Sequence, residues 1–176
     1  LIALGEDGRR TVLSRADLRD KVLRLAGWMR ARGVIKGDRV AGYVPNSEIA
    51  LIAMLASASL GAIFSSCSPD FGITGVTDRF GQIEPKILIS INGYHYNGKI
   101  IDKREVVAQL VDALPSIEAV LIDFYLDDYR DISMIRAASV FADALTHAPL
   151  DSFVRVGFND PLFILYSSGT TGAPKC

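Results

Sequence analysis

Short apolar runs alternate with segments of helical periodicity along this chain, and this alternation restricts the possible folds more than any other feature. The runs that we expect to form strands are residues 11–13, 39–44, 62–66, 86–91, 119–123 and 162–167. The segments that we expect to form helices are the one between Ser14 and Gly33 and residues 48–60, 76–83, 103–114 and 140–145. Strands that alternate with helices form a parallel sheet through right-handed crossovers. The sequence therefore predicts an α/β fold, with a parallel sheet flanked by helices.

The first two helices carry the clearest local signals. Ser14 can cap the first helix with Asp17 in the capping-box position, and Gly33 can end it. Apolar residues recur between these ends at helical spacing, at Leu18, Val22, Leu25 and Met29. The segment 48–60 is apolar on nearly every side, so we expect the second helix to be buried.

The middle of the chain contains a small insertion in the alternating pattern. Asn-Gly turn signals at residues 92–93 and 97–98 flank two short apolar or aromatic runs, 94–96 and 99–101. Such signals are typical of a β-hairpin. Asp102 follows directly, and we expect it to cap the next helix.

The last eleven residues, 166–176, contain the strongest chemical signal of the chain. They read Tyr-Ser-Ser-Gly-Thr-Thr-Gly-Ala-Pro-Lys-Cys and come directly after an apolar run. Ligands of parallel sheets gather beyond the carboxyl ends of the strands. In such a loop glycines let the backbone approach closely, N–H groups converge on an anion, and a lysine adds positive charge. The sequence therefore predicts a phosphate site made by Ser167, Ser168, Gly169, Thr170, Thr171, Gly172 and Lys175.

Other interpretations of this segment remain open. It is not a Walker A loop, because Ala173 and Pro174 separate Gly172 from Lys175. A polar turn would explain some of its residues, but a plain turn needs only one or two special residues. A non-catalytic phosphate-binding α/β module and a purely structural domain are the alternatives to an enzyme.

No catalytic or metal-binding residue is predicted within the chain. Cys67 has no clear histidine or acidic partner in the sequence, so we do not expect it to act as a nucleophile. His95 and His147 are the only histidines, and each is expected at a surface loop or a helix end. The acidic cluster is expected to be a solvated loop rather than a metal site; it comprises Asp127, Asp128 and Asp131.

Composition excludes some classes of partner. A net charge of −1 gives no basic field for nucleic acid. The most apolar stretch, residues 49–64, is interrupted by serine and glycine and is shorter than the roughly 20 residues of a membrane span. Two distant cysteines favour a reducing compartment, which we expect to be the cytoplasm. The chain starts at Leu1 and stops in mid-motif at Cys176, so we expect truncation at both ends; the sequence gives no oligomeric state.

Residues 166–175 fill every position of the pattern [YF]-[ST]-S-G-[ST]-T-G-x-P-K, and the chain therefore resembles the adenylate-forming (AMP-binding) enzymes. The resemblance implies that residues 1–176 are an incomplete AMP-binding N-terminal domain, the first part of the large domain, without the C-terminal domain. It implies a ligase that uses ATP, Mg²⁺ and CoA. A carboxylate would attack the α-phosphorus of ATP, and CoA thiolate would then displace AMP.

The resemblance also implies roles for the residues of the terminal loop. The hydroxyls and N–H groups of Ser168, Thr170 and Thr171 would donate to the β- and γ-phosphates. The two glycines would supply the turn, and Lys175 would neutralise charge or anchor the loop. The remaining catalytic parts of the family lie beyond this motif, so we expect this chain alone to be inactive.

A narrower similarity runs through residues 61–72, 78–86 and 93–99, which resemble the acyl-CoA synthetases of this family that use acetoacetate. Acetate, propionate and butyrate remain alternative acids. In related enzymes the hairpin places an arginine near the CoA phosphates, but Tyr96 stands at that place here. Lys99 is expected to be a solvated lysine beside the turn.

Overall fold

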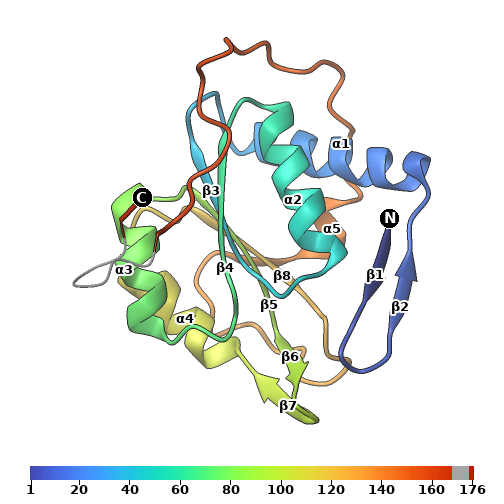
Figure 1. Ribbon diagram of the computed structural model, residues 1–176, viewed down its shortest axis with the longest axis vertical. Coiled ribbons are helices and arrows are strands. Elements are labelled where there is room, and N and C mark those ends of the chain that lie inside the picture. Colours follow the sequence, from blue (N-terminus) through green and yellow to red (C-terminus); the bar gives the residue numbers. More distant parts are fainter. Residues whose placement is uncertain (168–174) are drawn as a thin grey trace.

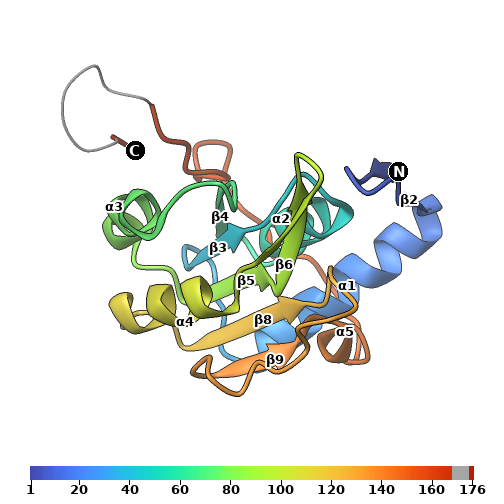
Figure 2. The same cartoon turned by 90° about the horizontal axis from the view of Figure 1, so that it is seen from below.

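A computed structural model describes residues 1–167 and 175–176 of the protein. Its main sheet has five parallel strands in the order β4-β3-β5-β8-β9 (Figures 1 and 2). The strands are β3 (Arg39–Tyr43), β4 (Ile63–Cys67), β5 (Ile87–Ile91), β8 (Ala119–Asp123) and β9 (Ala138–Val140). The helices are α1 (Arg15–Ala31), α2 (Glu48–Ser59), α3 (Ile73–Ile83), α4 (Arg104–Ala113) and α5 (Phe141–Ala144). This arrangement confirms the predicted α/β fold.

Helices cover both faces of the sheet. Helices α1, α2 and α5 pack against one face, and α3 and α4 pack against the other (Figure 2). Strand β5 serves both cores, because Ile87, Ile89 and Ile91 point into the first and Leu88 into the second. A strand buried on both sides reads as a continuous apolar run, which explains the pattern of residues 86–91. Among the described residues no helix is both long and apolar enough to cross a bilayer.

Two antiparallel hairpins lie outside the main sheet. Strands β1 (Ile2–Leu4) and β2 (Arg10–Val12) form the first, and β6 (Gly93–Tyr96) and β7 (Lys99–Asp102) form the second. The second hairpin extends beyond the sheet at the lower edge of Figure 1. Its turn is made by Asn97 and Gly98, whose φ angles of 49° and 71° are the left-handed values that a tight hairpin turn requires. The predicted hairpin is confirmed, and the expected strand 11–13 proves to belong to the other one.

The signals of the first helix are confirmed. Ser14 accepts a hydrogen bond from the backbone N–H of Asp17 at 3.1 Å, and the carboxylate of Asp17 accepts one from the N–H of Ser14 at 3.0 Å. Gly33 follows the helix with a φ of 73°, as a helix-ending glycine should. Helix α2 has no exposed residue, and six of its twelve residues are buried while the others are half-buried, so the predicted burial is confirmed for one side of the helix.

The main differences from the prediction concern the starts of two helices and one additional strand. The N-cap of α4 is Lys103, and Asp102 instead accepts hydrogen bonds from the backbone N–H and the guanidinium of Arg104. Helix α3 begins at Ile73, three residues before its predicted start at Val76. Residues 138–140 form strand β9, which the sequence does not indicate because a three-residue run is too short to show a period of two.

The last apolar run, residues 162–167, does not form the predicted strand. It lies beside β4 and makes one parallel bridge, in which Phe64 donates to the carbonyl oxygen of Leu162 at 3.1 Å and accepts from the N–H of Ile164 at 3.0 Å. Two residues later the hydroxyl of Tyr166 donates to the carbonyl oxygen of Arg79 on α3. The run therefore leaves the sheet edge after one pair of hydrogen bonds.

Candidate functional site

The strand order places a crevice at one end of the sheet. The chain passes from β3 outward to β4 and then returns to the other side of β3 to form β5. The chain leaves β3 toward β4 on one side and leaves β5 toward β8 on the other, so the loops after β3 and β5 run in opposite directions. Open α/β sheets bind ligands at such a point. A cavity of about 270 Å³ lies there. Its polar lining includes Asn46, Ser68, Asp70, Tyr94, Tyr96 and Tyr125.

A hydrogen-bonded network fixes one wall of this crevice. The hydroxyl of Tyr94 on β6 donates to the carboxylate of Asp70 at 2.5 Å, and Ser68 donates to the same carboxylate at 2.8 Å. These bonds, that of Tyr94 first, hold the pKa of Asp70 below its usual value. Burial and the Asp70 hydrogen bond raise the pKa of Tyr94. Asp70 is therefore a fixed anion beside a neutral tyrosine.

Lys103 and Tyr43 lie next to this network. The Lys103 ammonium lies 3.4 Å from the hydroxyl of Tyr43 and 5.7 Å from the ring centre of Tyr94. Burial lowers the pKa of Lys103, and the Asp70 charge opposes that shift. The hydroxyl of Tyr43 lies 2.7 Å from the carbonyl oxygen of Phe71, and burial raises its pKa to about 12. The loop after β4 is thus held by β3, β6 and the start of α4.

Sequence reasoning missed this role of Tyr43 and Lys103. Tyr43 lies within the predicted strand 39–44 and Lys103 begins the predicted helix 103–114, and neither was predicted to have a role at the site. No local pattern relates the two, because they are 60 residues apart in the chain. Asp70 carried a usable signal, since it follows a predicted strand end.

The structure brings together the two described ends of the terminal loop, residues 166–176, which we call the glycine-rich segment. The N–H of Ser167 donates to the carbonyl oxygen of Lys175 at 3.0 Å, and the two residues form an antiparallel bridge. Both residues are exposed, so the lysine is open to an anion in solution. The other predicted phosphate-binding residues lie outside the described part of the chain; they are Ser168, Gly169, Thr170, Thr171 and Gly172.

Cys67 lies at the buried end of β4. Burial raises the pKa of its thiol to about 11, and the nearby Arg79 lowers it only in part. The thiolate is the reactive form, and the raised pKa disfavours it at neutral pH. His95 lies on strand β6 rather than in a loop, and His147 follows the short helix α5.

Two carboxylates of the acidic cluster, those of Asp127 and Asp131, have partners within the protein. Asp127 lies 3.4 Å from the guanidinium of Arg130, and the carboxylate of Asp131 accepts from the N–H of Ser133 at 3.0 Å. Among residues 1–167 and 175–176, no three histidine, cysteine or acidic side chains gather as a metal ion would need.

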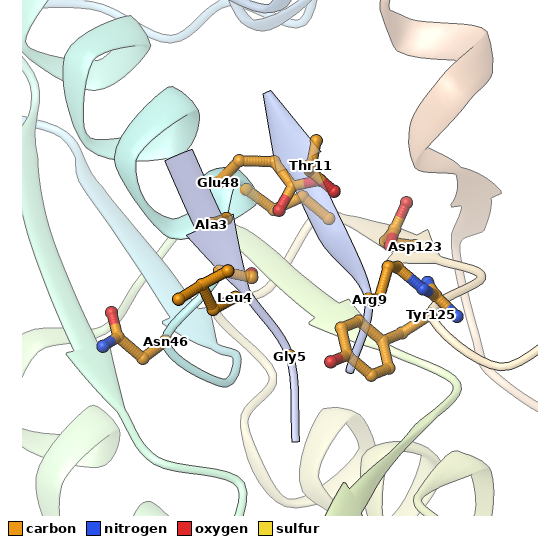
Figure 3. A pocket seen from close by; sticks show the side chains of 11 residues that line it. Ala3, Leu4, Gly5, Arg9, Thr11, Asn46, Glu48, Asp123 and Tyr125 are labelled. Atoms are coloured by element: carbon orange, nitrogen blue, oxygen red, sulfur yellow. The ribbon is translucent and has the colours of Figure 1, made fainter. Parts of the chain in front are cut away.

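A second, smaller cavity is lined by a carboxylate whose pKa is raised. The cavity holds about 40 Å³ and lies where the hairpin β1–β2 covers the end of β8 and the start of α2 (Figure 3). Figure 3 shows Asp123 and Glu48 on its lining, with Arg9 beside Tyr125. Burial, followed by the negative charge of Glu48, raises the pKa of Asp123 to about 6, while Arg9 and Lys21 lower it. The charged form of Asp123 is therefore disfavoured in the folded protein.

This shift predicts that Asp123→Asn stabilises the protein at high pH. Because the pKa in the folded state lies above the value of 3.8 for a free carboxyl, stability is lost as the pH rises from about 4 to about 6. We expect the variant to gain about 3 kcal/mol in free energy of unfolding at pH 8 and nothing near pH 4. Urea unfolding at both values measures this, with Asp112→Asn on the exposed side of α4 as control. A loss of stability at pH 8 would contradict the assignment.

Comparisons with known proteins agree on one family. Residues 2–176 match the family described as AMP-binding enzyme. The acetoacetyl-CoA synthetase of Macaca fascicularis is 48% identical over 167 residues, which cover 91% of this chain and 25% of that protein. The acetoacetyl-coenzyme A synthetase of Rhizobium meliloti is 44% identical, over 100% of this chain and 27% of its own length. The malonamoyl-CoA synthetase of Penicillium aethiopicum is 41% identical, over 100% and 25%.

A solved structure shows the same fold. The acetoacetyl-CoA synthetase from Streptomyces lividans superposes with a TM-score of 0.91 at 39% sequence identity. The match covers 98% of this chain and 26% of that protein. The chain thus spans about a quarter of the length of the relatives that it matches.

Proposed function

The chain belongs to the AMP-binding enzyme family, and from this we propose that the protein containing it is an ATP-dependent acetoacetate–CoA ligase. In the first step acetoacetate attacks the α-phosphorus of ATP, which gives acetoacetyl-adenylate and releases pyrophosphate. In the second step the CoA thiolate attacks the acyl carbon and AMP leaves. The products are acetoacetyl-CoA, AMP and pyrophosphate. Residues 1–176 form the first part of the AMP-binding domain.

One observation carries this assignment. Relatives named acetoacetyl-CoA synthetase, from vertebrates and from a bacterium, are 44–49% identical to this chain over nine-tenths of it or more. The similarity runs through the crevice loops as well as the glycine-rich segment, since it covers nearly the whole chain. Two free cysteines support a reducing compartment, and we place the reaction in the cytoplasm.

The roles proposed for this chain concern the phosphates of ATP. Adenylation needs positioning and charge neutralisation more than covalent help from the protein. Lys175, which is exposed beside Ser167, fits a polyanion that approaches from solution. The hydroxyls and N–H groups between them would bind the β- and γ-phosphates; these groups belong to Ser168, Thr170 and Thr171. Bound Mg²⁺ would offset the remaining phosphate charge.

A second acid is supported by one relative. The malonamoyl-CoA synthetase of Penicillium aethiopicum is nearly as similar to this chain as the bacterial acetoacetyl-CoA synthetase, at 41% against 44% identity. Malonamate and acetoacetate both carry a carboxylate at the first carbon, a methylene at the second and a carbonyl group at the third. We therefore keep malonamate as the alternative substrate of the same ligase chemistry.

The test is an exchange assay on the complete protein that contains this chain. ATP–pyrophosphate exchange would be measured with acetoacetate, malonamate, acetate, propionate and butyrate. We expect the highest kcat/KM with acetoacetate. Faster exchange with another acid would replace the substrate but keep the ligase. A well-folded protein that exchanges with none of them would leave only a phosphate-binding α/β domain.

A further inference from the structure

Helix α3 contacts the start of the glycine-rich segment through Arg79. The hydroxyl of Tyr166 donates to the backbone carbonyl of Arg79 at 3.0 Å, and the guanidinium carbon of Arg79 lies 5.8 Å from the centre of the Tyr166 ring. The same guanidinium lies 4.4 Å from the centre of the Phe71 ring and donates to the carbonyl oxygen of Gly75 at 2.7 Å. Arg79 therefore connects Tyr166 to the loop that follows β4.

The described contacts of the Arg79 guanidinium are with two aromatic rings and one backbone carbonyl. Among residues 1–167 and 175–176, no carboxylate forms an ion pair with Arg79. A guanidinium over an aromatic ring is attracted by the negative face of the ring, and the attraction is stronger where water is partly excluded. Arg79 and Tyr166 are both half-buried, so their contact is of this kind.

The far end of the segment lies against the same helix. The thiol of Cys176 donates to the side-chain oxygen of Gln82, which lies one turn beyond Arg79 on α3, at 3.5 Å. Ser167 and Lys175 are bonded to each other across the base of the segment. In Figure 1 the carboxyl end of the chain lies beside α3, clear of the helices on the other face. Both ends of the segment thus contact helix α3.

We infer that Arg79 is a positioning residue for adenylation: it sets where Tyr166, and with it Ser167 and Lys175, stand relative to the loop after β4. This inference rests on the proposed function. Arg79 would act through its contacts with Tyr166 and Phe71. The backbone of Phe71 is itself fixed by the hydroxyl of Tyr43. The sheet, the loop after β4 and the base of the phosphate segment are in this way one connected unit.

The two half-reactions separate this role from a general effect on folding. The β- and γ-phosphates are present only while the acyl-adenylate forms, and thioester formation begins after pyrophosphate has left. A shift at the base of the phosphate segment therefore slows adenylation alone. General destabilisation would lower the amount of active protein and slow both steps equally.

The experiment uses Arg79→Met in the complete protein, which keeps the apolar stem and removes the cation and the bond to Gly75. We expect kcat/KM for ATP in pyrophosphate exchange to fall about tenfold. Conversion of a supplied acyl-adenylate to the thioester should stay within about twofold of wild type. Arg32→Met is the matched control, because Arg32 also stacks on an aromatic ring, 3.8 Å from the centre of Trp28, at the end of α1. It should change neither step.

A second variant keeps the test decisive if Arg79→Met folds poorly. Arg79→Lys retains a cation near the two rings but loses the planar fork, so we expect about a threefold loss confined to adenylation. Equal losses in both half-reactions, or no loss in adenylation for either variant, would overturn the inference while leaving the ligase intact. A wild-type protein that adenylates no acid would overturn the proposed function, and this inference with it.

Discussion

Replacing Lys175 with alanine in the complete protein is expected to lower the kcat/KM for ATP in pyrophosphate exchange about 100-fold, with folding unchanged. Removal of one preorganised donor that stabilises charge in the transition state typically costs about 100- to 1000-fold in kcat, and we expect an effect of this size for Lys175. Lys175 is exposed and lies at the base of the glycine-rich segment, so its removal empties no core position. Steady-state exchange at varied ATP concentration measures the effect, and circular dichroism checks the fold.

The control for this variant is another exposed lysine. Lys36→Ala removes an exposed lysine that pairs with Asp160 at 2.7 Å, and surface pairs of this kind contribute little. We expect its exchange rate to match wild type. If Lys175→Ala exchanges as fast as Lys36→Ala, Lys175 does not contact the phosphates.

The variant Asn92→Leu is expected to lower the free energy of unfolding by about 4 kcal/mol. Asn92 is fully buried at the end of β5. Its side-chain nitrogen donates to the carbonyl oxygens of Leu126 and Asp128, each at 2.9 Å, and its oxygen accepts from the N–H of Leu126 at 3.0 Å. Leucine would leave these backbone groups buried without partners. Urea unfolding at pH 7 measures the loss.

A second substitution tests the same cause without a change of size. Asn92→Asp keeps the shape but places a carboxylate oxygen where an amide faces two carbonyl oxygens, so it should destabilise at least as much at pH 7. Asn159→Leu, at an exposed position, should change stability by less than about 0.5 kcal/mol. A loss below about 1 kcal/mol for both Asn92 variants would contradict the contribution assigned to these side-chain hydrogen bonds.

Asn92 shows why part of the fold could not be predicted. In the sequence Asn92-Gly93 has the appearance of a turn signal, and the neighbouring pair Asn97-Gly98 is indeed the hairpin turn. The backbone at Asn92 only bends, and its side chain instead ties the end of β5 to the loop after β8. The same dipeptide thus has two uses, and only the packing distinguishes them.

Part of the candidate site could likewise be predicted from the sequence, and part could not. The signature of residues 166–175 indicates phosphate chemistry from residue types alone, and the family match agrees with it. The network of Asp70, Tyr94 and Lys103 and the contact of Arg79 with Tyr166 were not predicted. Each joins elements that the chain order separates.

The sequence by itself determined the alternation of strands and helices, the capping box at Ser14 and the hairpin turn at Asn97. These features depend on side chains within a few residues of one another, so short stretches of the sequence are enough to predict them. The tertiary structure alone decided which polar groups meet. Tyr94 and Asp70 are 24 residues apart, and Tyr166 and Arg79 are 87 apart. Their contact follows from the order of the strands in the sheet, which no local propensity encodes.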